Sequence, residues 1–189
     1  YTGRNTLSLH DALPILFEPY ITDHPDVLLI SICRTSDKRV FASFYTKGVY
    51  CYDAQGNKMD YFNTDNSPLT NNYVMDLLEY KGKLWLATDG GGINLIDMES
   101  GEFTILNHTT GNPSSLPVNS IIKLYKDYND NLWIGSVRGG VINVKESYIH
   151  TYQDVLLNQP IGLTEKAVTS MYEEEDGRLW IGTDGGGIN

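Results

Sequence analysis

One tryptophan-centred segment recurs three times in this chain, and it constrains the fold more than any other feature. Its copies read KLWLATDGGGINLID, NLWIGSVRGGVINVK and RLWIGTDGGGIN, and each carries Ile-Asn after the glycines. The tryptophans, Trp85, Trp133 and Trp180, lie 48 and 47 residues apart. Self-similarity at a period of about 20–50 residues is typical of repeat architectures, in which each repeat is one supersecondary unit.

Further markers keep the same period. Three leucines that precede the segments, Leu69, Leu116 and Leu163, are spaced by 47 residues. A fourth, weaker copy, RVFASFYTKGVYCYD, has Phe41 at the tryptophan position and Gly48 at a glycine position. We expect the tryptophans to lie in the core and the glycines to serve backbone conformation. The glycine pairs of the three stronger copies are Gly91 and Gly92, Gly139 and Gly140, and Gly186 and Gly187.

Each repeat predicts a four-stranded antiparallel meander. In the third copy we expect strands at residues 120–125, 132–136, 141–144 and near 148–152. The segments between them, such as Asp127–Asp130 and Val137–Gly140, contain Gly, Asn and Asp residues that suit tight turns. The strands are almost continuously apolar, which fits a sheet that neighbouring sheets cover on both faces.

A four-stranded unit of about 45 residues with Trp and Gly at fixed offsets is typical of a β-propeller. A β-sandwich also has closely spaced short strands, but it gives no reason for the same residues to recur at this period. We therefore predict an all-β fold, a β-propeller fragment of about three and a half four-stranded antiparallel blades. We expect blades at residues 27–66, 67–113 and 114–160 and an incomplete one at 161–189, with open edges that favour association of the isolated chain.

The first residues look foreign to this repeat pattern. The sequence TLSLHDALPI, at residues 6–15, resembles the translation of a sequencing-library adapter. We therefore interpret residues 1–15 as non-native and residues 16–189 as the partial propeller. On this interpretation the true N-terminus is missing, so the lack of a secretory leader carries no information about location.

Composition excludes several classes of function. The 189 residues include 14 Lys and Arg against 24 Asp and Glu, a formal net charge of −10, which argues against nucleic acid as a partner. Cys33 and Cys51 fall on the first and third strands of one blade, about 9–10 Å apart, too far for a disulfide. We find no nucleophilic triad, P-loop, helix-borne carboxylate pair or histidine metal motif, so we predict no catalytic residue, no cofactor and no metal site.

The segment MYEEEDGRLWIGTDGGGIN, with its two sister copies, resembles the two-component regulator propeller repeat. The resemblance covers residues 70–189 strongly and 27–66 weakly. It implies the periplasmic sensor region of a hybrid two-component histidine kinase, whose parent chains carry seven-bladed propellers followed by a β-sandwich, a membrane helix and kinase and regulator domains. It also implies a homodimeric parent, an inner-membrane location and an oligo- or disaccharide ligand.

We expect the ligand on the disc face that carries the turns between second and third strands and the long connections between blades. Those connections are rich in Asn, Ser, Pro and Thr, and loops of this kind form binding surfaces. The carboxylates of Asp89 and Asp184 could instead accept hydrogen bonds from N–H groups of their own turns. Arg138 could simply be solvated or form a salt bridge. The candidate ligand-binding residues are Asn71, Asn72, Asp89, Asn119, Arg138 and Asp184.

Three functional hypotheses follow. The first is a ligand sensor whose bound state changes the packing of a dimer and passes a signal through the membrane. The alternative is a propeller scaffold that holds protein partners without sensing a small molecule. A propeller enzyme would need a convergent acid–base pair, whereas the candidate Asp residues recur in equivalent turns, as architectural residues do.

Overall fold

The computed structural model describes residues 19–21, 26–112, 114–145, 148–152 and 162–189. The segment that we interpret as non-native, 1–15, lies outside them. All regular secondary structure in the described residues is β-strand, arranged as three four-stranded sheets and one three-stranded sheet. No helix among these residues is long and apolar enough to cross a membrane. The predicted all-β class is therefore confirmed.

Each sheet is an antiparallel meander in sequence order, and we call the sheets blades 1 to 4. Blade 1 contains β1 (Leu29–Arg34), β2 (Val40–Phe44), β3 (Gly48–Tyr52) and β4 (Lys58–Phe62). Blade 2 contains β5 (Val74–Tyr80), β6 (Lys83–Thr88), β7 (Gly92–Asp97) and β8 (Phe103–Leu106). Blade 3 contains β9 (Ile121–Lys126), β10 (Leu132–Ser136), β11 (Val141–Lys145) and β12 (Tyr148–Tyr152). Blade 4 contains β13 (Val168–Glu173), β14 (Leu179–Thr183) and β15 (Gly187–Ile188).

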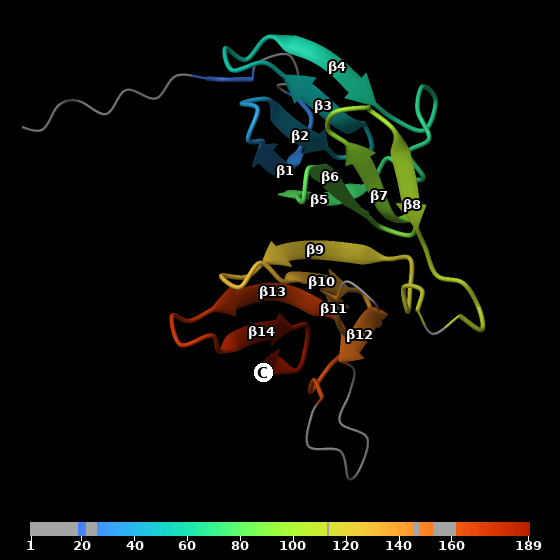
Figure 1. Ribbon diagram of the computed structural model, residues 1–189, viewed down its shortest axis with the longest axis vertical. Helices are drawn as coiled ribbons and strands as arrows, with labels where there is room; N and C mark the ends of the chain where they lie inside the picture. Colours follow the sequence, from blue (N-terminus) through green and yellow to red (C-terminus); the bar gives the residue numbers. More distant parts are fainter. Residues whose placement is uncertain (1–18, 22–25, 113, 146–147, 153–161) are drawn as a thin grey trace, which may run out of the picture.

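The blades are arranged as in a propeller. The first strands of successive blades contact one another, β1 with β5, β5 with β9 and β9 with β13. Figure 1 shows the four sheets following one another, with the fourth strands β4, β8 and β12 away from these contacts. Three of the four hydrophobic clusters lie between blades, so that Trp85 of blade 2 packs in one cluster with Leu124 and Ile134 of blade 3. The predicted partial propeller is confirmed.

A polar contact at the first strands ties three blades together. Asp76 of β5 is buried and accepts hydrogen bonds from the Ser31 hydroxyl of blade 1 (2.8 Å) and the Leu124 backbone N–H of blade 3 (2.9 Å). The Lys123 ammonium forms an ion pair with the same carboxylate at 3.0 Å. Because a buried carboxylate is stable only when it is paired and hydrogen-bonded, this residue fixes how the three first strands meet.

The turn that follows each tryptophan strand is held by a hydroxyl group. Thr88 Oγ1 donates to the Gly92 carbonyl at 2.8 Å, and Ser136 Oγ donates to the Gly140 carbonyl at 2.7 Å. Gly92 has a φ of +75°, and a Cβ there would collide with the Leu106 carbonyl of β8. The Gly at this point of the repeat therefore meets two demands, a left-handed backbone and close approach of the fourth strand.

The three tryptophans occupy one register in their blades, but their exposure differs. Trp85 is paired with Leu78 and Leu95, Trp133 with Tyr125 and Asn143, and Trp180 with Tyr172. Trp85 is 7% exposed, Trp133 is half-buried and Trp180 is 37% exposed. The structure thus differs from the expectation of a core position at Trp180, because no described residue covers that face of blade 4.

The two cysteines are free, as the strand assignment predicts. Cys33 lies on β1 and Cys51 on β3, with β2 between them. Cys51 is buried and Cys33 half-buried, and this burial raises the pKa of both thiols. Both therefore stay in the thiol form as small core side chains.

Candidate ligand-binding surfaces

Three of the six predicted ligand-binding residues lie in one hydrogen-bonded cluster. Asn71 Nδ2 donates to the Asp89 carbonyl at 2.7 Å. The Asn119 carbonyl accepts from the backbone N–H groups of Gly90 (3.1 Å) and Gly92 (2.7 Å). The cluster joins the connections on either side of blade 2 to the turn between β6 and β7.

The side chains of this cluster are largely engaged within the protein. Asn71 Oδ1 accepts from the Tyr73 N–H at 2.8 Å, and Asn119 Oδ1 accepts from the His108 N–H at 2.6 Å. The Asp89 carboxylate accepts from the Ser120 hydroxyl. This Asp does not bond its own turn, as an Asx residue would, but the neighbouring connection. The hydrogen bonds of this cluster therefore join blades 2 and 3.

The other three candidates lie apart from that cluster. Asn72 Oδ1 accepts from the Thr64 N–H at 2.9 Å within the connection that precedes blade 2. Asp184 is exposed, and its N–H donates to the Ala167 carbonyl. Arg138 is exposed and has a φ of +63° at a turn position where blade 2 has Gly90. A side chain held in this region costs free energy, so Arg138 is the candidate that turn geometry explains least.

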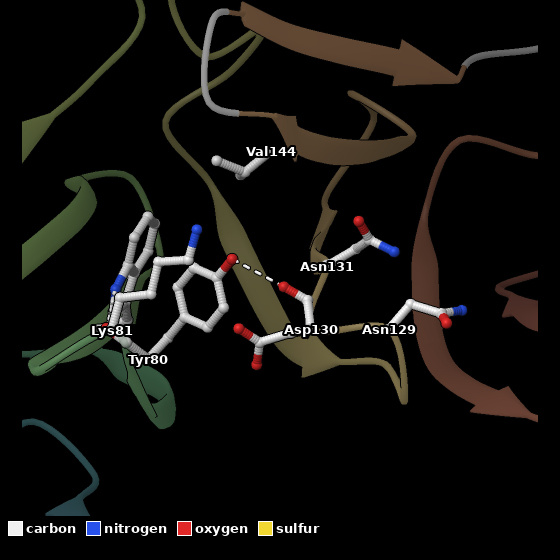
Figure 2. A pocket seen from close by; sticks show the side chains of 7 residues that line it. Tyr80, Lys81, Asn129, Asp130, Asn131 and Val144 are labelled. Carbon is white, nitrogen blue, oxygen red and sulfur yellow. Dashed lines mark hydrogen bonds between the residues drawn. The ribbon is translucent and has the colours of Figure 1, made fainter.

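The described residues form a cavity on the opposite face, at the seam between blades 2 and 3. Its volume is about 550 Å³, within the range of small-molecule sites. It opens beside the turn between β9 and β10 (Figure 2). Its walls are Tyr80, Lys81, Trp85, Asn129, Asp130, Asn131 and Val144.

Blade 2 supplies the aromatic wall of this seam cavity. The rings of Tyr80 and Trp85 meet edge to face with centroids 5.9 Å apart. The Tyr80 hydroxyl donates to the Asp130 carbonyl of blade 3 at 2.9 Å, as Figure 2 shows. Lys81 Nζ lies 5.3 Å from the Tyr80 ring centroid, a cation–π contact at the mouth.

Blade 3 supplies the polar wall, which Asp127 holds in place. The Asp127 carboxylate accepts from the N–H groups of Asn129 (3.0 Å) and Asn131 (2.7 Å) and from Trp133 Nε1 (2.8 Å). Burial opposes the charge of this carboxylate, but these hydrogen bonds outweigh burial and lower its pKa. The turn that carries Asp130 is therefore a fixed platform, and Figure 2 shows the Asp130 carboxylate directed toward Tyr80.

This cavity was not predicted from the sequence, because the ligand was expected on the disc face that carries the turns between second and third strands. A signal was present in the repeat. The Ser36 N–H donates to Glu79 at 2.7 Å across the seam between blades 1 and 2, and the Tyr128 N–H donates to Glu173 at 2.9 Å across the seam between blades 3 and 4. At the seam between blades 2 and 3, Lys126 takes the place of these two glutamates, since all three residues pair with the leucine before the tryptophan.

A second cavity lies at the seam between blades 1 and 2 and has a different lining. Its volume is about 500 Å³, and its walls include four carboxylates, those of Asp37, Glu79, Asp97 and Glu99. No group of three or more potential ligands in the described part of the chain is arranged to hold a metal ion. The two cavities therefore differ in chemistry, one acidic and one with aromatic and amide groups.

Comparison with known proteins identifies the repeat. The family model described as two component regulator propeller matches residues 115–138 and 162–185. None of the curated proteins compared with the chain matches it. Both matched segments run from the connection before a blade to the turn between its second and third strands.

Solved structures share the fold at low sequence identity. The extracellular domain of the hybrid two component system BT3049 from B. thetaiotaomicron is 19% identical over 85% of this chain and 22% of that chain, with a TM-score of 0.72. The corresponding domain of BT4673 from the same organism is 22% identical over 89% of this chain and 24% of that chain, with a TM-score of 0.67. A catalytically inactive virginiamycin B lyase from Staphylococcus aureus is 14% identical over 89% and 57% of the two chains, with a TM-score of 0.60.

This chain spans about a quarter or less of the two extracellular domains that it matches. At these identities the likeness shows the fold, while the family model locates the repeat in the sequence. The predicted resemblance is confirmed for blades 3 and 4. The chain is a β-propeller segment that contains two-component regulator propeller repeats.

Proposed function

We propose that this chain is part of the extracytoplasmic sensor propeller of a hybrid two-component signal transduction protein. The observation that carries the proposal is the pair of two-component regulator propeller repeats at residues 115–138 and 162–185. The fold likeness to two extracellular domains of hybrid two-component systems supports the same role and an extracytoplasmic location, the periplasmic side of an inner membrane.

The partners follow from this role. Further blades of the same repeat would cover the open face of blade 4, where Trp180 and Ile188 are exposed. Signalling domains of the parent chain would receive the output, and a homodimer would transmit it as a change in packing between subunits. The chain itself would bind rather than catalyse, because the carboxylates of its turns serve the blades, as Asp89 and Asp127 do.

A carbohydrate, such as an oligo- or disaccharide, is the proposed ligand. Saccharides present many hydroxyl groups, which amide, carboxylate and cationic side chains bind through hydrogen bonds. The exposed residues Arg138 and Asp184 offer such groups on the face of the predicted loops, and the seam cavity offers them on the other face.

The parent gene provides the test of the signalling role. Its sequence beyond the codon for Asn189 should encode further blades, a membrane helix and a histidine kinase. The purified parent protein should change its autophosphorylation rate when the inducing oligosaccharide is added. A parent gene without kinase motifs would contradict the proposal. Capture of one protein partner, with no response to any saccharide, would favour the scaffold alternative.

A further inference from the structure

We propose that the seam cavity between blades 2 and 3 binds a saccharide ring, an inference that rests on the carbohydrate part of the proposed function. It places the ligand on the disc face opposite the predicted loop surface. The cavity is about 550 Å³, large enough for one or two sugar rings.

Beside this cavity the repeat departs from its pattern twice. In blades 1, 3 and 4 a five-residue segment joins the first two strands, whereas Lys81 and Gly82 alone join β5 to β6. The shorter turn of blade 2 leaves space beside the turn of blade 3. In addition, Lys126 has the strand position that Glu79 has in blade 2 and Glu173 in blade 4. Each of these carboxylates accepts a hydrogen bond from a backbone N–H of the preceding blade, which an ammonium group cannot do.

The lining suits a hydroxylated ring. The rings of Tyr80 and Trp85, each 7% exposed, and the Val144 side chain line an apolar wall against which the C–H face of a sugar can pack. The Asp130 carboxylate, 60% exposed and paired with Lys126 at 3.2 Å, can accept hydrogen bonds from two neighbouring hydroxyl groups. Lys81 supplies an ammonium donor at the mouth.

The neighbouring cavity shows why this seam is the better candidate. Four carboxylates dominate the walls of the cavity between blades 1 and 2. Glu79 there already accepts two hydrogen bonds from Ser36, and Asp97 is paired with Lys83 at 3.1 Å. That cavity has no aromatic residue in its walls, whereas the seam between blades 2 and 3 offers both an aromatic wall and the exposed Asp130 carboxylate.

Three left-handed residues provide a matched set of variants. Asp130, Arg138 and Lys38 have φ values of +62°, +63° and +72°. Replacement by Gly removes each side chain and suits the backbone, so all three variants should fold. Asp130→Gly also keeps the carbonyl that accepts from Tyr80. Arg138→Gly probes the loop surface, and Lys38→Gly is the control, because it lies at the equivalent turn position of blade 1.

The experiment is a titration with maltose, cellobiose, lactose and xylobiose, followed by calorimetry and by the indole N–H signals in a ¹⁵N-correlated NMR spectrum. At least one disaccharide should bind and shift the Trp85 signal, while the Trp180 signal stays in place. Asp130→Gly should weaken that binding by tenfold or more, and by more than Arg138→Gly does, while Lys38→Gly should leave it within twofold.

Two outcomes would overturn the assignment. If Arg138→Gly abolishes binding and Asp130→Gly leaves it unchanged, the saccharide binds on the loop surface, and the proposed sensor function survives without this site. If no saccharide binds to the chain or to the parent propeller, the site is wrong. The signalling role is then judged separately, from the kinase motifs and the autophosphorylation response of the parent protein.

Discussion

Blades 2 and 4 present the same surface, that of the repeated tryptophan, under different conditions. The face of blade 2 around Trp85 is covered by blade 3, and the indole is 7% exposed. The face of blade 4 around Trp180 is uncovered, and the indole is 37% exposed beside Met171 and Ile188. Both tryptophans lie three residues before the last residue of the second strand of their blade. The repeat therefore encodes half of an interface, and the following blade supplies the other half.

The different exposure of Trp85 and Trp180 shows which interactions belong to a single blade and which need a neighbouring blade. Hydrogen bonds within a blade are present in both places, since Thr88 and Thr183 each donate to a glycine carbonyl in the following turn. Burial of the tryptophan face is present only where a following blade covers it. The hydrophobic contribution per blade is thus a property of neighbouring pairs, as expected for repeat proteins.

The largest effect is expected from removal of a covered indole. Trp85→Ala should lower the free energy of unfolding by about 3–5 kcal/mol, because it leaves a cavity between blades 2 and 3. Trp180→Ala should cost about 1–2 kcal/mol, since part of that side chain is already in water. Urea unfolding monitored by circular dichroism measures both. Equal losses would show that the interface does not determine the contribution of the indole.

The next effect concerns the carboxylate that joins three blades. Asp76→Ala should lower the free energy of unfolding by about 2–3 kcal/mol, because it leaves the Leu124 N–H without its acceptor and Lys123 without its counter-ion. The equivalent residue of blade 4 is Ser170, which is exposed, and Ser170→Ala should cost less than about 0.5 kcal/mol. A loss at Ser170 as large as that at Asp76 would contradict the assigned role of Asp76.

Two equivalent glycines, one in blade 2 and one in blade 4, test the comparison of these blades through the cost of an added Cβ. Gly92→Ala should cost about 2 kcal/mol, because the left-handed φ is unfavourable and the added Cβ would meet the Leu106 carbonyl. Gly187 has a similar φ of +77°, but a Cβ there meets no atom within 4 Å in the described structure. Gly187→Ala should therefore cost about 1 kcal/mol, and differential scanning calorimetry would separate the two variants.

The smallest effect is one of pH. The pKa of Asp127 is lowered in the folded chain, so its contribution to stability is present above the ordinary value of 3.8 and is lost as the pH falls below that value. Asp127→Asn should cost about 1 kcal/mol at neutral pH, because Trp133 and Asn131 lose a charged acceptor. Urea midpoints between pH 3 and 7 should vary less in this variant. A slope equal to that of the wild type would contradict the assignment.

The repeat predicts strands well because the tryptophan register recurs. The strands expected at 132–136 and 148–152 coincide with β10 and β12. The alignment of the Ile-Asn pairs is less reliable. Trp85 is paired with Leu95, whereas Trp133 is paired with Asn143, so the structural equivalent of Asn94 is Ile142. A single residue after the glycines changes which side chain lies at each register position.

The reason for that substitution lies in a distant residue. Asn94 Oδ1 accepts from the Thr70 N–H at 3.1 Å, and Asn189 Oδ1 accepts from the Thr164 N–H at 2.7 Å. Blade 3 has Pro117 at the Thr position, and proline has no N–H to donate. The apolar Ile142 therefore replaces the Asn. Such compensation becomes visible only when the connection and the third strand are placed side by side.

The candidate sites were harder to predict than the strands. Residue type alone indicated Asn71 and Asn119, but the structure engages both in contacts that hold the connections around blade 2. The seam cavity lies beside the one short turn between first and second strands, at a seam where Lys126 stands in place of a carboxylate. The effect of the short turn and of Lys126 can be recognised only when the contacts across the other seams are known.

The most direct test of the central claim is acrylamide quenching of three single-tryptophan variants, in which the other two tryptophans are replaced by Phe. If equivalent indoles are buried by the next blade, the quenching constant should be smallest for Trp85, intermediate for Trp133 and largest for Trp180. Three equal constants, or a Trp180 shielded as well as Trp85 in the monomeric chain, would contradict the account.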